Sequence, residues 1–366
     1  MLETRMEAAG GAGVSIEEAA RVGVSVRSLG PWQATWYRLR RDPWTVVAMA
    51  ALAVVLLLSL FGGAIVSHIE GHAGDDLFPY GTVDKPSGRQ AVGPLTWVPK
   101  TFNTRIDQYG DLLPPPKGTP RTLFVLGADG ILGRDELIRL LDGGRTSLEI
   151  GIGGMLVALL LAIPIGAAAG YFGGFTDAIV SRFSETIMAF PMLLFLVFAT
   201  SKVSPYLAGV NYSWILAKGV FSDAVLIGAF TCFYPMRLIR AQILVLRQAE
   251  FVDSAHMTGA SDWRILRREL FPHLLPTLLV WGAIAIATNI LLEVSLSFIG
   301  VGVQPQIPTW GSLLSEAWGT IYGRGFSTNP TIWQTIFPTA AILVTVVALN
   351  QLSEGFRRAL EPWSRR

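Results

Sequence analysis

The side chains best placed to do chemistry are polar residues inside otherwise apolar runs. Glu293 and Asn289 lie in the stretch NILLEVSLSF, and Glu185 lies six residues before Pro191 in a third apolar segment. An acid within a membrane helix must face a partner or a water-filled path, because exposure to lipid is costly. Two interpretations therefore stay open for these residues, a place on a transport path or a polar contact that holds two helices together.

Other reactive side chains are few and scattered. The chain has one cysteine, Cys232, so no disulfide can form within it, and its four histidines lack metal-ligand spacing (His68, His72, His256 and His273). We therefore predict no metal site. The sequence contains no G-x-x-x-x-G-K-[ST], H-E-x-x-H or G-x-S-x-G motif. We expect neither a cofactor bound by this chain nor an enzyme acting alone, and no nucleic acid partner.

A polar island from Glu250 to Pro276 separates two long apolar runs. It predicts a short helix from about Asp253 to Thr258, ended by Gly259, the residue best suited to a left-handed helix terminus. Ser261 or Asp262 can cap a second helix, which carries Arg264, Arg267 and Arg268 before it meets Pro272 and Pro276. A loop that only connects two spans does not need two helices joined by a glycine turn. This arrangement indicates a surface on which another protein docks.

The composition requires a membrane around these residues. Of the 366 residues, 51% are hydrophobic and 15% charged, against about 25% charged in soluble proteins. A bilayer core of about 30 Å takes roughly 20 apolar helical residues. Six segments qualify, so we predict an all-α polytopic protein with spans at Trp44–Ser67, Ser147–Phe172, Asp177–Thr200, Asp223–Val245, Pro276–Val301 and Thr331–Leu352.

Arginines near the span ends predict the orientation. They gather before the first span, between the fourth and fifth, and in the tail. These three regions are therefore expected in the cytoplasm, with both termini. The predicted divisions are a cytoplasmic segment 1–43, a first span 44–67, an extracytoplasmic segment 68–144, a core 145–353 containing the cytoplasmic loop 247–275, and a tail 354–366. Within the extracytoplasmic segment, Asp135–Leu141 is expected to form an amphipathic helix at the outer surface.

The polar island also resembles a known motif. Permease subunits of bacterial ABC importers carry a cytoplasmic loop with the frame E-A-A, three residues, then Gly. Here that frame has Asp253, Ser254 and Ala255, then His256 to Thr258, then Gly259, with Asp and Ser as mild departures. The stretches GASDWRILRRELFPHLLP and SLSFIGVGVQPQIPTWGSLLSEA resemble the C-type permease of dipeptide and oligopeptide importers, and further blocks follow in the same order from Trp36 onward.

This resemblance implies a type I ABC importer permease in the bacterial inner membrane. Spans two to six would form the transport core, with the first span packed outside. The coupling segment, seated on a cytosolic ATPase, would comprise Asp253, Ser254, Ala255, His256, Thr258 and Gly259. The implied partners are a second permease subunit in a heterodimer, two cytosolic ATPases that bind ATP and Mg²⁺, an extracytoplasmic binding protein, a peptide substrate and the lipid bilayer.

Other functions remain possible from the sequence alone. An ion-coupled secondary transporter would use Glu293 and Glu185 as coupling sites. A membrane scaffold or sensor would use the extracytoplasmic segment to bind a ligand, but it leaves the helix–glycine–helix island without a purpose. Within the ABC permeases, relatives of the peptide type carry nickel chelates, glutathione or oligosaccharides instead of longer peptides.

Overall fold

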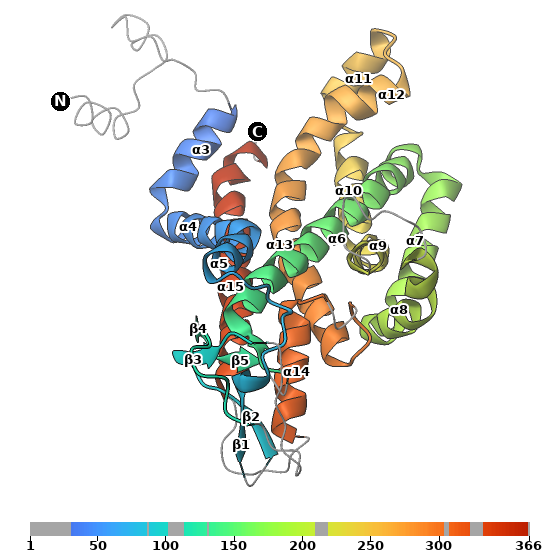
Figure 1. The fold of residues 1–366 in the computed structure, drawn as a ribbon. Coiled ribbons are helices and arrows are strands. Elements are labelled where there is room, and N and C mark those ends of the chain that lie inside the picture. The colour runs from blue at the N-terminus through green and yellow to red at the C-terminus, as the bar shows by residue number, and fades with distance from the viewer. Residues whose placement is uncertain are drawn as a thin grey trace, which may run out of the picture.

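The computed structural model describes residues 31–85, 88–101, 113–129, 132–208, 219–303, 307–322 and 332–364. Helices make up most of this part of the chain, and short strands gather at one end of the helical bundle (Figure 1). Residues 1–30 of the predicted cytoplasmic segment 1–43 lie outside the described residues. We refer below to the end that carries the strands as the β end, and to the opposite end, where α11 and α12 project, as the hairpin end (Figure 1).

In the part of the chain that the structure describes, four helical stretches are long and apolar enough to cross a bilayer singly. The first joins α4 (Pro43–Leu57), a π-helical turn (Leu58–Gly62) and α5 (Gly63–Glu70). The others are α6 (Glu136–Phe172), the run from Asp262 to Phe298 that ends in α13 (Phe271–Phe298), and α15 (Ile332–Ser364) as far as Leu360. Two bent pairs also pass this test together, so the six predicted spans are reached with each pair counted as one.

The bent pairs are α7 (Gly174–Met188) with α8 (Met192–Ala208), and α9 (Val220–Thr231) with α10 (Phe233–Leu246). The first pair turns by 88° and the second by 42°. A proline inside a membrane helix commonly kinks it, and Pro191 and Pro235 both lie in these predicted spans. Pro191 instead follows a full break, because the proline disfavours helical geometry for Phe190, and the third span is two helices nearly at right angles.

The β end is a small subdomain that the prediction of an all-α protein did not include. Its described residues form three antiparallel pairs, β1 (Thr82–Lys85) with β2 (Gly88–Ala91), β3 (Thr96–Pro99) with β4 (Arg121–Phe124), and β5 (Ala128–Asp129) with β6 (Arg134–Asp135). A 3₁₀ turn (Pro79–Gly81) precedes them. Their shared core is apolar and consists of Phe78, Ala91, Val92, Val98, Phe124 and Ala128.

Two helix boundaries differ from expectation. The outer-surface helix expected at Asp135–Leu141 is the beginning of α6, which starts at Glu136 and continues without a break into the span. The second helix of the polar island does not stop at Pro272 either. It runs from α12 (Asp262–Arg264) through a π-helical segment (Ile265–Leu270) into α13. Pro272 is tolerated because it lies in the first turn of α13, where a missing N–H costs little.

Three further helices belong to the described part of the chain. α3 (Pro31–Arg41) precedes the first span and contacts α15, where the Arg38 guanidinium donates to the Ala359 carbonyl at 3.2 Å. α11 (Glu250–Met257) forms the hairpin with α12. α14 (Trp310–Tyr322), which the sequence analysis did not anticipate, packs between α13 and α15.

Helix α6 crosses the middle of the bundle and packs against α9, α10 and α13 (Figure 1). Glycines bring its backbone close to α10. A Cβ atom on Gly166 would lie 2.6 Å from the Met236 carbonyl oxygen, and one on Gly170 would lie 2.8 Å from the Arg240 carbonyl oxygen. Small residues allow such close approach between membrane helices, so these glycines fix the α6–α10 contact.

We expect Gly166→Ala to destabilise the purified protein by about 1–3 kcal/mol, because the neighbouring backbone atoms cannot make room for a methyl group. Gly282 offers a matched control in α13, since a Cβ there would meet only the Met155 sulfur, at 3.9 Å. Thermal unfolding in detergent should show a lower Tm for Gly166→Ala and no loss for Gly282→Ala. Equal Tm values for the two variants would contradict the close-contact account.

A buried ion-pair network joins the β end to the helices. The Arg139 guanidinium is fully buried and binds Glu316 of α14 through two nitrogens, at 2.7 and 3.2 Å. It also pairs with Asp129 of β5. Arg134 bridges the same two carboxylates, each at 2.7 Å. Because burial makes such charges dependent on their partners, this cluster holds β5, β6, α6 and α14 together.

Large apolar side chains cover the outside of the spans. Those more than half exposed include Val54, Leu160, Phe175, Phe183 and Phe198. A soluble protein rarely leaves so much contiguous apolar surface uncovered. A bilayer, or another membrane subunit, accounts for it.

Candidate functional site: a projecting hairpin and an apolar cavity

The hairpin of α11 and α12 has the glycine turn that the sequence predicts. Gly259 has φ +79°, in the left-handed region. Its N–H donates to the His256 carbonyl at 2.9 Å, and the Ala260 N–H donates to the Ala255 carbonyl at 3.0 Å. This pair of hydrogen bonds is the Schellman arrangement that closes a helix end. The helix begins earlier than expected, at Glu250, and ends at Met257.

The hairpin is anchored rather than free. Val252 of α11 is 1% exposed and joins the core formed by α6, α10 and α13, together with Ile265 and Leu270 of the π-helical segment. At the end of α6, the Tyr171 hydroxyl donates to Asp262 at 2.8 Å and lies 3.4 Å from His256 Nε2. A force on either arm of the hairpin is therefore transmitted to α6 and α13.

The outer face of the hairpin combines polar and apolar groups. Of the predicted coupling residues, Asp253, Ser254, His256, Thr258 and Gly259 are exposed and Ala255 is partly covered. Beside them, Met257 is 89% exposed and Trp263 is 71% exposed. Sequence reasoning missed both, although an apolar residue next to a glycine turn in a polar island was a visible signal. Exposed apolar side chains within a polar rim are typical of a protein-binding surface.

The second feature is an apolar cavity of about 400 Å³. The two bent helix pairs meet α13 around it, and its lining comprises Met188, Phe190, Met192, Phe230, Thr231, Phe233, Tyr234, Trp281, Ile284, Ala285, Thr288 and Asn289. The two helix pairs bend at Phe190 and Cys232, and aromatic side chains beside each bend line the cavity opposite α13. Such volume and lining suit a small, partly apolar ligand.

The structure separates the polar residues singled out from the sequence. Asn289 lines the cavity, its amide nitrogen donates to the Gly151 carbonyl at 3.2 Å, and its oxygen has no hydrogen-bond partner among the described residues. Glu293, one turn further along α13, is fully buried and accepts hydrogen bonds from Ser297 at 2.8 Å and Ser147 at 3.2 Å. Trp310 at the start of α14 donates to that same Ser147. Glu293 therefore sits where α6, α13 and α14 meet.

Glu185 lies elsewhere, exposed on α7 and paired with Arg182 at 3.1 Å. Its carboxylate also interacts electrostatically with Arg240 of α10, and none of its described contacts connects it to Glu293. A different acid does lie near Glu293, namely Asp223 of α9, which is 1% exposed. Asp223 was predicted only to begin a span, although its position inside the apolar run GVFSDAVLIGAF was a visible signal.

The stability of Glu293 variants tests whether this carboxylate holds α6, α13 and α14 together. We expect Glu293→Ala to destabilise the protein by about 2–5 kcal/mol, because it opens a void and strips Ser147 and Ser297 of their acceptor. Glu293→Gln, which keeps the volume and one oxygen, should retain most of the stability. Thermal unfolding in detergent measures both. A stable Glu293→Ala variant would mean that the carboxylate holds no helices together.

Comparisons with known proteins agree with this geometry. Residues 162–366 match the family model described as "binding-protein-dependent transport system inner membrane component". Residues 30–79 match "N-terminal TM domain of oligopeptide transport permease C". The first match covers more than half of the chain and includes the hairpin, α13 and all of the residues that line the cavity. The predicted resemblance to permeases of the peptide type is thereby confirmed.

Individual relatives give the same result. The glutathione transport system permease protein GsiD of Pectobacterium atrosepticum is 36% identical over 243 residues, 66% of this chain and 74% of the relative. A Brucella ovis protein named as a peptide permease is 33% identical over 236 residues, 64% of this chain and 72% of the relative. A Brucella suis protein named as a peptide transport system permease is 33% identical over 245 residues, 66% of this chain and 75% of the relative. The chain therefore belongs to the family of binding-protein-dependent transport system inner membrane components.

Proposed function

We propose that this chain is the C-type permease subunit of an ABC importer and forms half of a peptide translocation path. The observation that carries the proposal is the anchored hairpin, which holds Met257 and Trp263 exposed beside a Schellman turn at Gly259. A membrane helix bundle that ends in such a surface is suited to receive motion from a separate protein. A permease also needs a space for its substrate, and the apolar cavity between the bent helices and α13 provides one.

The proposed partners follow from this arrangement. Two cytosolic ATPases bind ATP and Mg²⁺, and one of them receives the hairpin of α11 and α12. A second permease subunit covers the exposed apolar faces of this chain and completes the cavity, and an extracytoplasmic binding protein delivers the substrate to the β end. The hairpin, α3 and the end of α15 lie at the same end of the bundle (Figure 1), which supports the assignment of that end to the cytoplasm by its arginines.

Peptides are the substrate class that this cavity and its relatives favour. Its aromatic and aliphatic lining accommodates apolar side chains, and the Asn289 amide oxygen and Tyr234 hydroxyl offer hydrogen-bonding groups to a peptide backbone. The relatives described above are named for peptide or glutathione transport. An ion-coupled transporter with Glu293 and Glu185 as coupling sites fits less well, because one is buried in a helix contact and the other exposed on α7.

The substrate proposal is tested in proteoliposomes that contain both permease subunits and the ATPases, with the binding protein added outside. We expect ATP-dependent uptake of labelled di- to hexapeptides. Glutathione, a nickel chelate and an oligosaccharide serve as competing substrates in parallel vesicles. Uptake of one of these with no uptake of any longer peptide would overturn the peptide proposal while leaving the ABC permease assignment intact. Uptake driven by an ion gradient without ATP would overturn both.

A further inference from the structure

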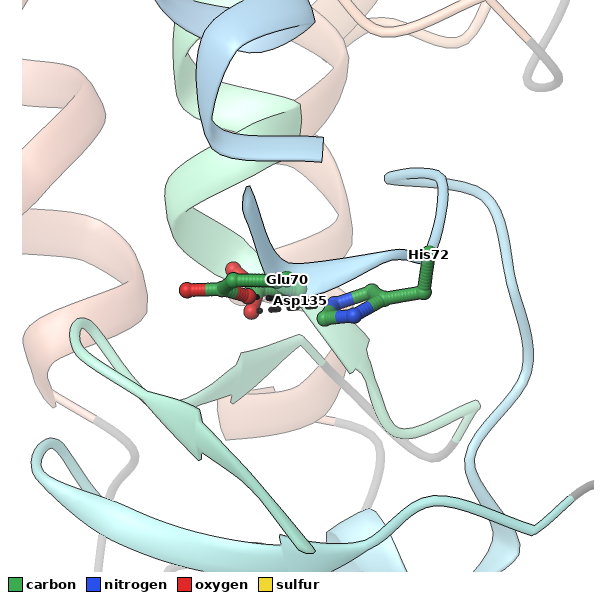
Figure 2. A group of neighbouring side chains, drawn as sticks. All are labelled: Glu70, His72 and Asp135. Carbon is green, nitrogen blue, oxygen red and sulfur yellow. Dashed lines mark ion pairs between the residues drawn. The ribbon is translucent and has the colours of Figure 1, made fainter. Parts of the chain in front are cut away.

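Three side chains from separate parts of the chain converge at the β end. Glu70 ends α5, His72 follows two residues later, and Asp135 lies immediately before α6. Figure 2 shows the three side chains directed toward one another. One potential ligand atom from each lies within 4.8 Å of the other two. No spacing rule in the sequence reveals this group, because Asp135 stands 63 positions after His72.

The separations fit a shared metal ion better than hydrogen bonds. His72 Nε2 lies 3.3 Å from a Glu70 oxygen and 3.5 Å from an Asp135 oxygen. A charge-assisted N–H···O bond is shorter, about 2.7–2.9 Å. Tetrahedral zinc with ligand bonds of about 2.0–2.2 Å places neighbouring ligand atoms about 3.3–3.5 Å apart. Both distances therefore match the edge of a tetrahedral coordination shell.

The facing polar atoms of Glu70, His72 and Asp135 are buried and lack hydrogen-bond partners among the described residues. The side chains of His72 and Asp135 are fully buried. Neither ring nitrogen of His72, nor the facing oxygens of Glu70 and Asp135, has a hydrogen-bond partner among the described residues. Asp135 uses only its other oxygen, which accepts from the N–H groups of Leu137 and Ile138 and caps α6. Unpaired buried polar atoms cost free energy, and a bound cation would satisfy the two carboxylate oxygens and the Nε2 atom of His72.

The surroundings define the kind of cation. Phe78 and Phe124 pack against the His72 ring, with centroids 4.9 and 6.0 Å away, so one wall of the group is dry and rigid. Lys100 is the neighbouring cation, but its ammonium donates to the Glu70 backbone carbonyl at 2.7 Å. One imidazole and two carboxylates favour Zn²⁺ or a similar transition metal over Ca²⁺ or Mg²⁺, which prefer oxygen ligands alone. Two carboxylate charges balance the 2+ ion.

We propose that Glu70, His72 and Asp135 bind a divalent transition metal, Zn²⁺ by preference, which fastens the end of the first span to the beginning of α6. Glu70 is partly exposed, so a water molecule has access to the fourth position. The site lies far from the hairpin, at the opposite end of the bundle (Figure 1). Its role is structural, and it holds the β end in one position relative to two spans. It replaces the expectation of no metal site.

The test uses the full-length chain, purified in detergent without a polyhistidine tag, stripped with EDTA and dialysed against ZnCl₂. Elemental analysis should find about one Zn²⁺ per chain. His72→Ala and Glu70→Gln should each weaken binding at least about tenfold. His68→Ala is the matched control, since His68 is exposed four residues earlier on α5 and should retain wild-type binding. The Tm of the wild type should rise with Zn²⁺ and fall with EDTA.

Two results would overturn the proposal. The first is a wild-type protein that takes up no Zn²⁺ and shows the same Tm with Zn²⁺ and with EDTA, as expected if a protonated His72 pairs with both carboxylates. The second is equal binding by the wild type and by His72→Ala and Glu70→Gln. Because the wild-type titration needs no variant, failure of a variant to fold leaves the test intact. Co²⁺ in place of Zn²⁺ adds a visible spectrum that reports tetrahedral coordination directly.

Discussion

Gly259→Val should reduce ATP-driven uptake at least about tenfold in the reconstituted importer while leaving the membrane bundle folded. The φ of +79° at this position is one that valine adopts only under strain. That strain costs about 1–2 kcal/mol, and about 1.4 kcal/mol corresponds to a factor of ten in an equilibrium. A Cβ at Gly259 would meet no atom within 4 Å. The effect therefore comes from the backbone, which must turn α12 away from its direction relative to α11.

The control for Gly259→Val is Gly118→Val. Gly118 has φ +88° and the same open space around a Cβ, but it lies in the loop before β4. Gly118→Val should strain the backbone to a similar extent but leave ATP-driven uptake unchanged. Gly259→Asn should fall between glycine and valine, since asparagine tolerates the left-handed region. Uptake and substrate-stimulated ATPase activity measure all three, and equal activity of Gly259→Val and the wild type would remove the turn from the coupling account.

Arg139→Met should destabilise the protein by about 3–5 kcal/mol, the usual consequence of removing one partner of a buried ion pair. The change leaves Asp129 and Glu316 with Arg134 alone, and it leaves the buried Glu136 without its neighbouring cation. Arg139→Lys keeps the charge but loses the two-nitrogen contact with Glu316, so it should recover only part of the stability.

The same helix provides the control for Arg139→Met. Arg145 pairs with Glu149 at 2.9 Å, and its side chain is 58% exposed. Arg145→Met should shift stability by less than about 1 kcal/mol, because exposed pairs contribute little. Thermal unfolding and limited proteolysis of the loops at the β end provide the measurements. Similar Tm values for the two methionine variants would show that the buried network does not hold the β end to the helices.

The parts of the structure that the sequence predicted are those with a local physical cause. Gly259 ends α11 because a left-handed turn needs only one residue without a Cβ, and that is visible in a single chain. The long apolar runs predict the spans for the same reason, since one segment by itself must satisfy the bilayer. Asp253 to Thr258 therefore appeared on an exposed helix and its end, as the frame of the motif indicated.

The parts that the sequence did not predict depend on contacts between distant segments. The second helix of the island was expected to run as far as Pro272, but the π-helical segment before this proline leads directly into α13. Pro191 indicated a disturbed helix, but the 88° angle between α7 and α8 is a property of the folded chain. Glu70, His72 and Asp135 meet through the folding of the β end, so neither their spacing nor their number in the sequence revealed them.

Cross-linking tests the central claim, that the hairpin of α11 and α12 receives the ATPase. Cys232 is the only cysteine and is buried, so Cys232→Ala provides a cysteine-free background. Met257→Cys in that background, treated with a short bifunctional thiol reagent in the assembled importer, should form a cross-link to an ATPase subunit that changes in yield with ATP. Lys117→Cys, exposed at the β end, should form none. A cross-link to the ATPase from Lys117→Cys, with none from Met257→Cys, would contradict the account.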